Sequence, residues 1–202
     1  MQREFVLATG NKGKVKELAD VLSPFNVTLR PQSDFNVSSV EETGLTFVEN
    51  AIIKARHAAN ETGLPCLADD SGLAVDALQG APGIYSARFA GHDASDRQNI
   101  DKLLHELIDT PTPQRTAQFH CCLVFMRHAA DPTPIISHGI WRGDILTELQ
   151  GDGGFGYDPV FWLNAENCTA AQLSKPEKQA ISHRGKAVSG LITQMQSSGI
   201  LG

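Results

Sequence analysis

Two adjacent aspartates, Asp69 and Asp70, are the residues of this sequence with the clearest capacity for chemistry. They follow an apolar run, residues 64–68, that predicts a buried strand. Catalytic side chains often lie on loops held by rigid strands, and Mg²⁺ prefers one or two carboxylates together with substrate phosphates. The following Ser71 and Gly72 also make the segment typical of an Asp-rich turn. We therefore predict a turn after residue 68, and the sequence leaves open whether the aspartates form a site.

A second candidate site lies near the N-terminus, where residues 5–8 predict a buried strand and residues 9–11 a turn. A helical pattern begins near Gly13. This unit points backbone N–H groups and the positive end of a helix at one spot, and Lys12 and Lys14 add positive charge there. Such an arrangement suits a polyphosphate. The spacing differs from that of a P-loop, and an ordinary strand–helix turn with two solvated lysines fits the same residues.

A third segment, residues 151–159, is rich in glycine and contains the pattern G-x-G-x-x-G. A dinucleotide-binding interpretation is disfavoured because the strand-like residues 160–162 follow it, where that motif requires a helix. Glycines beside Phe155, Tyr157 and Asp158 suit close backbone approach to a flat ligand, with an aromatic ring to stack on it. A plain glycine turn whose aromatic residues pack in the core is the alternative.

A last helix is predicted from about Pro176, because proline is favoured at the first helical position. It carries Lys178 and Ser182, which are four residues apart and share a face, with His183 and Arg184 beside them. These residues could contact a ligand. A solvated basic face is the other interpretation, since such charge patterns are common on exposed helices.

The elements that must position these residues alternate between strand and helix along the first half of the chain. Capping patterns predict helices over residues 46–63 and 95–108. Two long extended runs, 116–127 and 135–146, are joined by turn residues 130–133 and predict an antiparallel hairpin. We therefore expect an α/β fold with a mixed sheet.

Composition limits the class of protein. The chain has 202 residues, of which 41% are hydrophobic and 20% charged, as in a globular protein of one domain or two small lobes. The net charge of -6 argues against a nonspecific duplex-binding surface. No apolar run reaches membrane-spanning length, and no signal-peptide pattern precedes the first strand, so we expect a cytoplasmic protein. The cysteines lack zinc-ligand spacing and are expected to be buried, reduced thiols.

Taken together, these segments resemble the non-canonical purine nucleoside triphosphate pyrophosphatases, also called inosine/xanthosine triphosphate pyrophosphatases, in their bacterial form. The resemblance runs in family order through nearly the whole chain. It rests on Ala8-Thr9-Gly10-Asn11-x-x-Lys14, Glu42-Thr43-Gly44-x-Thr46-Phe47-x-Glu49-Asn50-Ala51, Ala68-Asp69-Asp70-Ser71-Gly72-Leu73, the segment from Gly80 to Arg88, Gly153-Gly154-Phe155-Gly156-Tyr157-Asp158-Pro159 and Ile181-Ser182-His183-Arg184-Gly185.

The resemblance implies an elongated central mixed sheet flanked by helices, with an active-site cleft between two lobes of a single domain over residues 1–202. It also implies a homodimer that requires Mg²⁺ and hydrolyses ITP, dITP and XTP to the monophosphate and pyrophosphate. The implied role is to remove deaminated purines from the nucleotide pool, with no nucleic-acid or membrane partner.

The family's functional residues fall on matching positions of this sequence. The resemblance implies that Asp70 is the catalytic acid and that Glu42 and Asp70 hold the metal. The implied substrate contacts are Thr9, Gly10, Asn11, Lys12, Gly13, Lys14, Lys54, Ser71, Phe155, Gly156, Tyr157, Asp158, Lys178, His183 and Arg184.

These assignments imply a geometry that the structure can test. Lys14 and the two acids Glu42 and Asp70 should converge on one magnesium triphosphate, where positioning and charge neutralisation dominate catalysis. A water near Asp70 would attack the α-phosphorus, with Asp70 as general base or as a metal ligand that orients the water. The sequence leaves Asp69 open as the base. It also leaves as rivals a pyrophosphatase for modified pyrimidines, a non-catalytic nucleotide-binding module and a nucleic-acid-binding protein.

Overall fold

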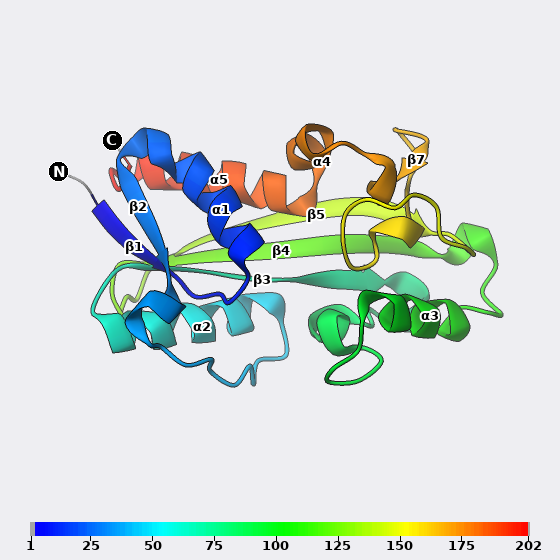
Figure 1. The fold of residues 1–202 in the computed structure, drawn as a ribbon, viewed down its shortest axis with the longest axis horizontal. Coiled ribbons are helices and arrows are strands. Elements are labelled where there is room, and N and C mark those ends of the chain that lie inside the picture. The colour runs from blue at the N-terminus through cyan, green and yellow to red at the C-terminus, as the bar shows by residue number, and fades with distance from the viewer. Residues whose placement is uncertain (1–2, 202) are drawn as a thin grey trace. The chain divides into compact units, whose positions relative to one another are not determined.

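The computed structural model describes residues 3–201, apart from the side chains of Lys12 and Glu17. Its strands form one sheet in the order β2-β1-β3-β4-β5-β6-β7 (Figure 1). The sheet is mixed, because β1 is parallel to β2 and β3 whereas β6 is antiparallel to β5 and β7. The expected mixed α/β sheet is therefore confirmed. The chain divides into two compact units, and strands β3, β4 and β5 contribute to both.

Unit 1 comprises the residues up to Asp70, Cys122–His138 and the segment from Ala187. It begins with β1 (Arg3–Leu7), α1 (Lys12–Leu22), β2 (Val27–Pro31) and α2 (Phe47–Thr62). Because parallel strands need a crossover connection, each of these helices links one strand to the next. Figure 1 shows α1 and α2 on opposite sides of the strands. The two helices therefore approach β3 from opposite faces of the sheet.

The buried face of α2 consists of small side chains. Ala51, Ala55, Ala58 and Ala59 pack against alternate residues of the neighbouring strands, such as Val6, Cys66, Ala68, Cys122 and Val124. Alanines let the helix backbone come close to the sheet, which brings the longer side chains of α2 within reach of β3.

The ends of α2 follow the predicted signals. Thr46 Oγ1 accepts a hydrogen bond from the Glu49 N–H, and Gly63 ends the helix with φ 68°. The Glu49 carboxylate accepts from the N–H of Leu45, one residue before the cap. The local sequence therefore fixes where this helix starts and stops.

Strand β3 (Cys66–Val75) corrects the prediction of a turn at residues 69–72. The strand runs without a break through Asp69 and Asp70, both of which are buried. A buried carboxylate is costly unless it is paired. Each of these two has a lysine partner supplied by a helix, Lys14 for one and Lys54 for the other, and these pairs permit an extended conformation that the local sequence disfavours.

Unit 2 comprises Ser71–Cys121 and Gly139–Lys186. Helix α3 (Asp96–Glu106) begins at Ser95 with the reciprocal capping box that the sequence predicts. The long strands β4 (Thr116–Met126) and β5 (Ile135–Ile145) agree with the predicted extended runs, and β6 (Phe161–Leu163) and β7 (Cys168–Thr169) extend the sheet. The core of this unit is built on aromatic and aliphatic side chains from these elements, including Leu73, Leu103, Phe119, Trp141 and Phe161.

The predicted single last helix is wrong, because the structure has two helices. Helix α4 (Lys175–Ile181) ends at Ser182, whose backbone is extended with φ -69° and ψ 164°, and α5 (His183–Ser197) follows at once. Gly185 lies so close to α4 that a Cβ there would be 1.7 Å from the Gln179 carbonyl oxygen. This close approach of α5 to α4 turns the chain at Ser182.

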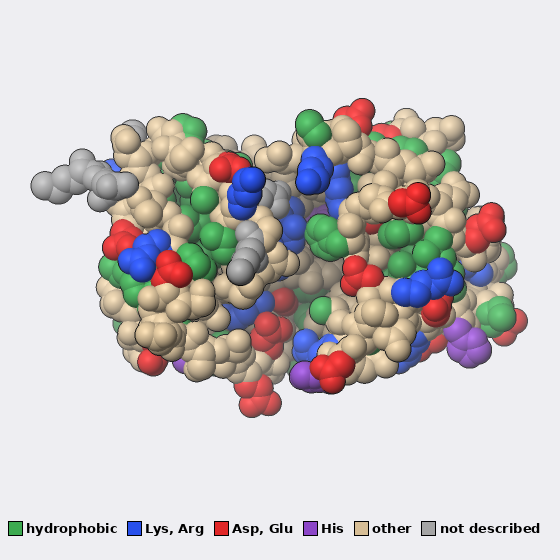
Figure 2. All heavy atoms as spheres, in the orientation of Figure 1, with side chains coloured by type: hydrophobic (Ala, Val, Ile, Leu, Met, Phe, Trp, Pro, Cys, Tyr) green, Lys and Arg blue, Asp and Glu red, His purple; other side chains and the backbone are tan. Residues whose placement is uncertain are grey.

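The remaining sequence expectations concern thiols, charge and membranes. Cys66, Cys121 and Cys122 are buried and Cys168 is half-buried, and all four are free thiols. Acidic and basic side chains are interspersed on the face shown in Figure 2. Within residues 3–201, no helix is both long and apolar enough to cross a membrane.

Candidate active site

The loop between β1 and α1 forms the first part of the site. Asn11 caps α1, because its Oδ1 accepts from the N–H groups of Gly13 at 2.9 Å and Lys14 at 3.2 Å. Its own N–H donates to Thr9 Oγ1 at 3.2 Å. The sequence predicts that these helix N–H groups point at a ligand, but Asn11 binds two of them here. An anion that uses them must therefore compete with the Asn11 side chain.

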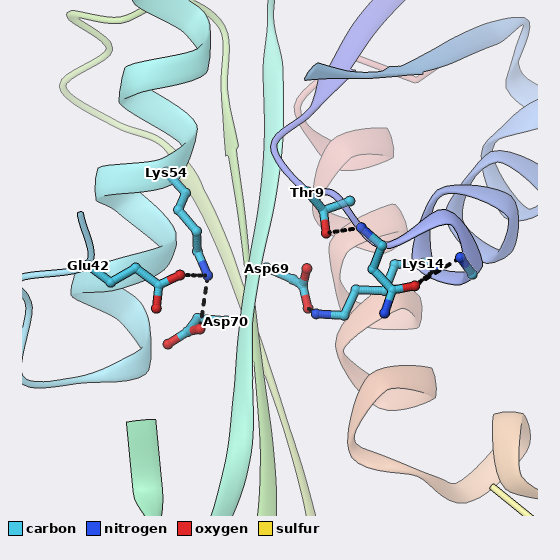
Figure 3. A network of polar contacts seen from close by, with 8 residues as sticks. Thr9, Lys14, Glu42, Lys54, Asp69 and Asp70 are labelled. Carbon is cyan, nitrogen blue, oxygen red and sulfur yellow. Dashed lines mark hydrogen bonds and ion pairs between the residues drawn. The ribbon is translucent and has the colours of Figure 1, made fainter. Parts of the chain in front are cut away.

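The first turn of α1 is electropositive. It contains no acidic residue, and lysines occupy its first and third positions. A helix N-terminus carries partial positive charge, so it favours an anion and disfavours lysine. The Lys14 ammonium is held by Asp69 Oδ2 at 2.7 Å (Figure 3). The Lys12 side chain, also predicted to bind substrate, lies outside the described part of the chain.

On the other face of β3, three residues meet. The Lys54 ammonium from α2 lies 3.1 Å from Glu42 Oε1 and 2.9 Å from Asp70 Oδ1 (Figure 3). The predicted metal-binding acids Glu42 and Asp70 are therefore brought together. Asp70 Oδ2 is buried and has no hydrogen-bond partner among the described residues. Two carboxylates share one ammonium, which leaves the cluster able to accept more positive charge.

Asn50 holds the loop that carries Glu42. This asparagine is fully buried, and its Oδ1 accepts from the Gly44 N–H at 2.8 Å. A Cβ at Gly44 would lie 2.5 Å from the Cβ of Glu49. The hydrogen bond holds the loop against the start of α2, and the short Cβ distance shows that only glycine fits at position 44 without displacing its neighbours. Gly44 and Asn50 both belong to the motif that runs from Glu42 to Ala51, but the sequence alone did not predict their role in holding the loop. The glycine was the one signal that could have indicated it.

Lys14 is paired with Asp69, whereas Asp70 is paired with Lys54. Successive side chains of a strand point to opposite faces of the sheet, so Asp69 meets Lys14 and Asp70 meets Lys54 on either side of β3 (Figure 3). Consecutive Cα atoms are about 3.8 Å apart, so both ion pairs start from one point of the strand. The register of β1 with β3 ends at the pair Leu7–Leu67, just before that point.

The electrostatics of this cluster follow from burial and from the excess of carboxylates. Burial raises the pKa of Asp70, and the charges of Glu42 and Asp69 add to that effect while Lys54 opposes it. Burial alone would lower the pKa of Lys54, but Asp70 and the other two acids outweigh it and raise that pKa. Lys54 therefore stays charged, and Asp70 is a stronger base than an ordinary aspartate.

A second set of predicted residues gathers in unit 2 around Phe155. Phe155 is 59% exposed, and the Lys178 ammonium lies 4.5 Å and the Arg184 guanidinium carbon 5.8 Å from the centroid of its ring. Asp158 is buried and accepts from both the Phe155 N–H and the Lys178 ammonium. Gly154 has φ 75°, and a Cβ there would lie 2.0 Å from Asp158 Oδ2. Asp158 thus shapes the loop that presents the Phe155 ring.

Tyr157 belongs to the core of unit 2. The residue is 3% exposed, and its hydroxyl donates to the Ser86 carbonyl oxygen at 2.8 Å. Burial raises the pKa of that hydroxyl. The Tyr157 side chain therefore anchors the glycine-rich loop to the core, as expected if the aromatic residues of this segment pack in the core. A residue that the sequence did not reveal, Asp96 of α3, accepts from the Gly156 N–H at 2.6 Å and holds the same loop.

The last predicted contacts lie on α5 and β3. His183 and Arg184 open α5 and are both buried. The His183 ring stacks on Phe119, with centroids 4.9 Å apart and an interplanar angle of 14°. Ser71 follows Asp70 in β3 and is half-buried. Packing thus fixes the His183 ring in one orientation.

Two kinds of group bear on the chemistry of this site, the buried thiols and the possible metal ligands. Burial raises the pKa of Cys66 to about 12 and that of Cys122 to about 11, so neither is a nucleophile at neutral pH.

Within residues 3–201, His, Cys, Asp and Glu side chains do not gather in groups of three or more, as a metal site built from protein ligands alone would require. A pair of carboxylates without such a cage suits Mg²⁺, which takes its remaining ligands from water and substrate phosphates.

Comparison with known proteins shows extensive similarity. Residues 5–194 match the model of the Ham1 family. The chain is 63% identical over 195 residues to a dITP/XTP pyrophosphatase of Photobacterium profundum, covering 96% of this chain and 99% of the relative. A dITP/XTP pyrophosphatase of Shigella flexneri is 60% identical, with the same coverage of both chains.

Solved structures of proteins with these names also resemble this chain in fold. A HAM1 protein from Coxiella burnetii superposes with a TM-score of 0.93 at 49% identity, covering 96% of this chain and 99% of that one. A nucleoside-triphosphatase, dITP/XTP pyrophosphatase, from Mycobacterium abscessus gives 0.80 at 41% identity, covering 94% and 98%.

Proposed function

We propose that this chain, which belongs to the Ham1 family, hydrolyses the deaminated purine nucleotides dITP, ITP and XTP to the monophosphate and pyrophosphate with the help of Mg²⁺. The chain is a nucleotide pyrophosphatase, a hydrolase of triphosphate anhydrides. The observation that carries the finer proposal is the cluster of Glu42, Lys54 and Asp70, in which two carboxylates share a single ammonium.

We assign the triphosphate to the lysines and the loop of unit 1. A triphosphate carries about four negative charges, so catalysis depends on neutralising them and on holding the chain of phosphates still. Lys14 and Lys54 supply two ammonium groups on either side of β3. The N–H groups of Gly13 and Lys14 become further donors when a phosphate oxygen replaces Asn11 Oδ1.

The residues present fit a divalent cation. Asp70 Oδ2 is a buried acceptor without a partner among the described residues, and Glu42 adds a second carboxylate beside it. These two side chains would hold Mg²⁺, which supplies positive charge to the phosphate oxygens when it is bound. Lys54 then exchanges its carboxylate partners for phosphate oxygens.

Asp70 is the general base in this proposal. It accepts a proton from a water molecule, the water oxygen forms a bond to the α-phosphorus, and the bond from that phosphorus to the bridging oxygen breaks, releasing pyrophosphate. Asp69 is assigned no proton transfer, because its carboxylate is already held by Lys14 on the other face of the strand.

We assign the purine base to the residues around Phe155. The exposed ring offers a stacking surface, which accepts any base and so does not discriminate. Hypoxanthine and xanthine carry an oxo group where adenine has an amine, and Arg184 is a donor that suits the oxo group. An adenine amine facing such a buried donor finds no acceptor there, which costs about 1–3 kcal/mol. That penalty is the proposed source of discrimination against dATP.

The test is release of pyrophosphate from a panel of nucleotides. We expect turnover of dITP, ITP and XTP with Mg²⁺, little turnover of dATP and dGTP, and loss of all turnover with EDTA. Preference for a modified pyrimidine triphosphate would contradict the substrate assignment. Binding without turnover would indicate a nucleotide-binding module, and salt-dependent affinity for duplex DNA would revive the nucleic-acid hypothesis.

The quaternary state and cellular role complete the proposal. The family resemblance supports a homodimer that works in the cytoplasm and removes deaminated purines before polymerases use them. Light scattering should give twice the chain mass of 21.8 kDa. A monomer at assay concentrations that is fully active would contradict the dimer.

A further inference from the structure

Asp69 has no task in the proposed reaction, although its carboxylate is one of the most deeply buried charges of unit 1. Its side chain is 2% exposed, and Oδ2 lies 2.7 Å from the Lys14 ammonium. Burying a carboxylate costs several kcal/mol unless a partner compensates for it. The chain maintains this buried charge beside Asp70 but on the opposite face of β3 (Figure 3). Because Lys14 is the partner of this carboxylate, we looked to Lys14 for the role of Asp69.

Lys14 by itself would not stay where the structure has it. It lies in the first turn of α1, where the partial positive charge of the helix end repels an ammonium. A free lysine side chain also has many rotamers, and holding it in one costs up to about 2 kcal/mol of entropy. Nevertheless the Lys14 side chain is only 21% exposed. The Asp69 carboxylate supplies the attraction that offsets both effects.

We propose that Asp69 is a positioning residue that holds the Lys14 ammonium ready for an oxygen of the triphosphate. The proposal rests on the proposed function, since it gives Lys14 a phosphate to bind. An ammonium has three donors, and the Asp69 carboxylate needs only one of them. Lys14 can therefore contact a phosphate without leaving Asp69. Because the side chain is already ordered, substrate binding costs less entropy.

Other roles for Asp69 predict different kinetics. A second general base would act on the chemical step, so its loss would lower kcat with little effect on KM. If Asp69 were purely structural, its loss would lower stability, and its effect on KM would be the same whether or not Lys14 is present. A carboxylate that competes with the phosphate for Lys14 would lower KM when it is removed. Only positioning through Lys14 raises KM in a way that requires Lys14.

The experiment is a double-mutant cycle with dITP and Mg²⁺, using Asp69→Asn, Lys14→Met and the double variant. We expect Asp69→Asn to raise KM about tenfold, the loss typical of a hydrogen bond to a charged group, with kcat within about twofold of the unmutated enzyme. In the Lys14→Met background, Asp69→Asn should change KM by less than about twofold. An equal effect in both backgrounds, a kcat loss of about a hundredfold at unchanged KM, or a lower KM would overturn the proposal.

Two further variants keep the test sharp. Asp131→Asn removes another buried carboxylate of unit 1, the partner of Arg127, and should lower stability without changing KM. Should Asp69→Asn fold poorly, Asp69→Glu keeps the charge but displaces it by one methylene, and it too must raise KM only when Lys14 is present. The unmutated enzyme's turnover of dITP tests the proposed function separately, so the role of Asp69 can be refuted while the proposed function holds.

Discussion

Replacing Lys54 by methionine tests whether a lysine takes the place of a metal ion between Glu42 and Asp70. Methionine keeps most of the apolar stem and removes the charge. The side chains of Lys54, Glu42 and Asp70 are 16%, 26% and 11% exposed. Removing one partner of a buried ion pair costs about 3–5 kcal/mol and of a surface pair about 0–1 kcal/mol, so we expect about 2 kcal/mol at this half-buried cluster.

The change is large enough to measure by thermal unfolding. For a chain of this size, about 2 kcal/mol corresponds to a Tm lower by about 4–8 °C. Mg²⁺ should then recover much of the loss, because an ion at a hundred times its Kd stabilises a protein by about 2.7 kcal/mol. In the unmutated protein the ammonium already offsets one of the two carboxylate charges, so the same Mg²⁺ concentration should raise Tm less.

The assay is a melting series by circular dichroism with Mg²⁺, matched in ionic strength with NaCl. Arg97→Met is the control, because Arg97 pairs with Asp101 in a well-exposed i,i+4 pair of α3 and should contribute less than about 1 kcal/mol. If Mg²⁺ raises the Tm of Lys54→Met and of the unmutated protein equally, Lys54 does not stand in for the ion. An unchanged Tm in Lys54→Met without Mg²⁺ would refute the electrostatic reasoning itself.

Further predictions concern the same face of β3. Asp70→Asn should lower kcat about 10²–10⁴-fold with a much smaller change in KM for dITP, and near-normal turnover would remove Asp70 from the mechanism. Gly44→Ala places a Cβ 2.5 Å from that of Glu49, so it should displace the loop that carries Glu42. The Mg²⁺ concentration needed for half-maximal activity should then rise, and an unchanged Mg²⁺ requirement would contradict this role of the loop. Glu42→Gln removes a charge that raises the pKa of Asp70, so the carboxyl carbon of Asp70 should titrate at lower pH by ¹³C NMR, and a shift to higher pH would contradict the sign.

Local signals in the sequence were sufficient for most helix ends and strands. Thr46 and Ser95 begin α2 and α3 as predicted, and Gly63 ends α2 in the left-handed conformation. The alternating pattern over residues 116–127 likewise predicted strand β4. Each of these features depends on residues within one or two turns of one another, so a single sequence contains the needed information.

Motifs taken together gave the family and the composition of the candidate site. They predicted that Glu42 and Asp70 belong together, and the structure joins them through Lys54. The residues predicted around Phe155 also lie together, with Lys178 and Arg184 beside its ring. The motifs did not reveal the support of these groups. Asn50 behind the Glu42 loop and Asp96 beside Gly156 became apparent only from contacts.

Tertiary structure decided the geometry around β3. The aspartates that suggested a turn lie in a continuous strand, and their alternation sends them to different lysines on opposite faces. Lys14 is 55 positions from Asp69 in the sequence. The break at Ser182 likewise depends on the approach of α5 to α4 at Gly185. Local propensity cannot specify such outcomes, because the free energy that decides them comes from burying a charge or packing a backbone against a distant partner.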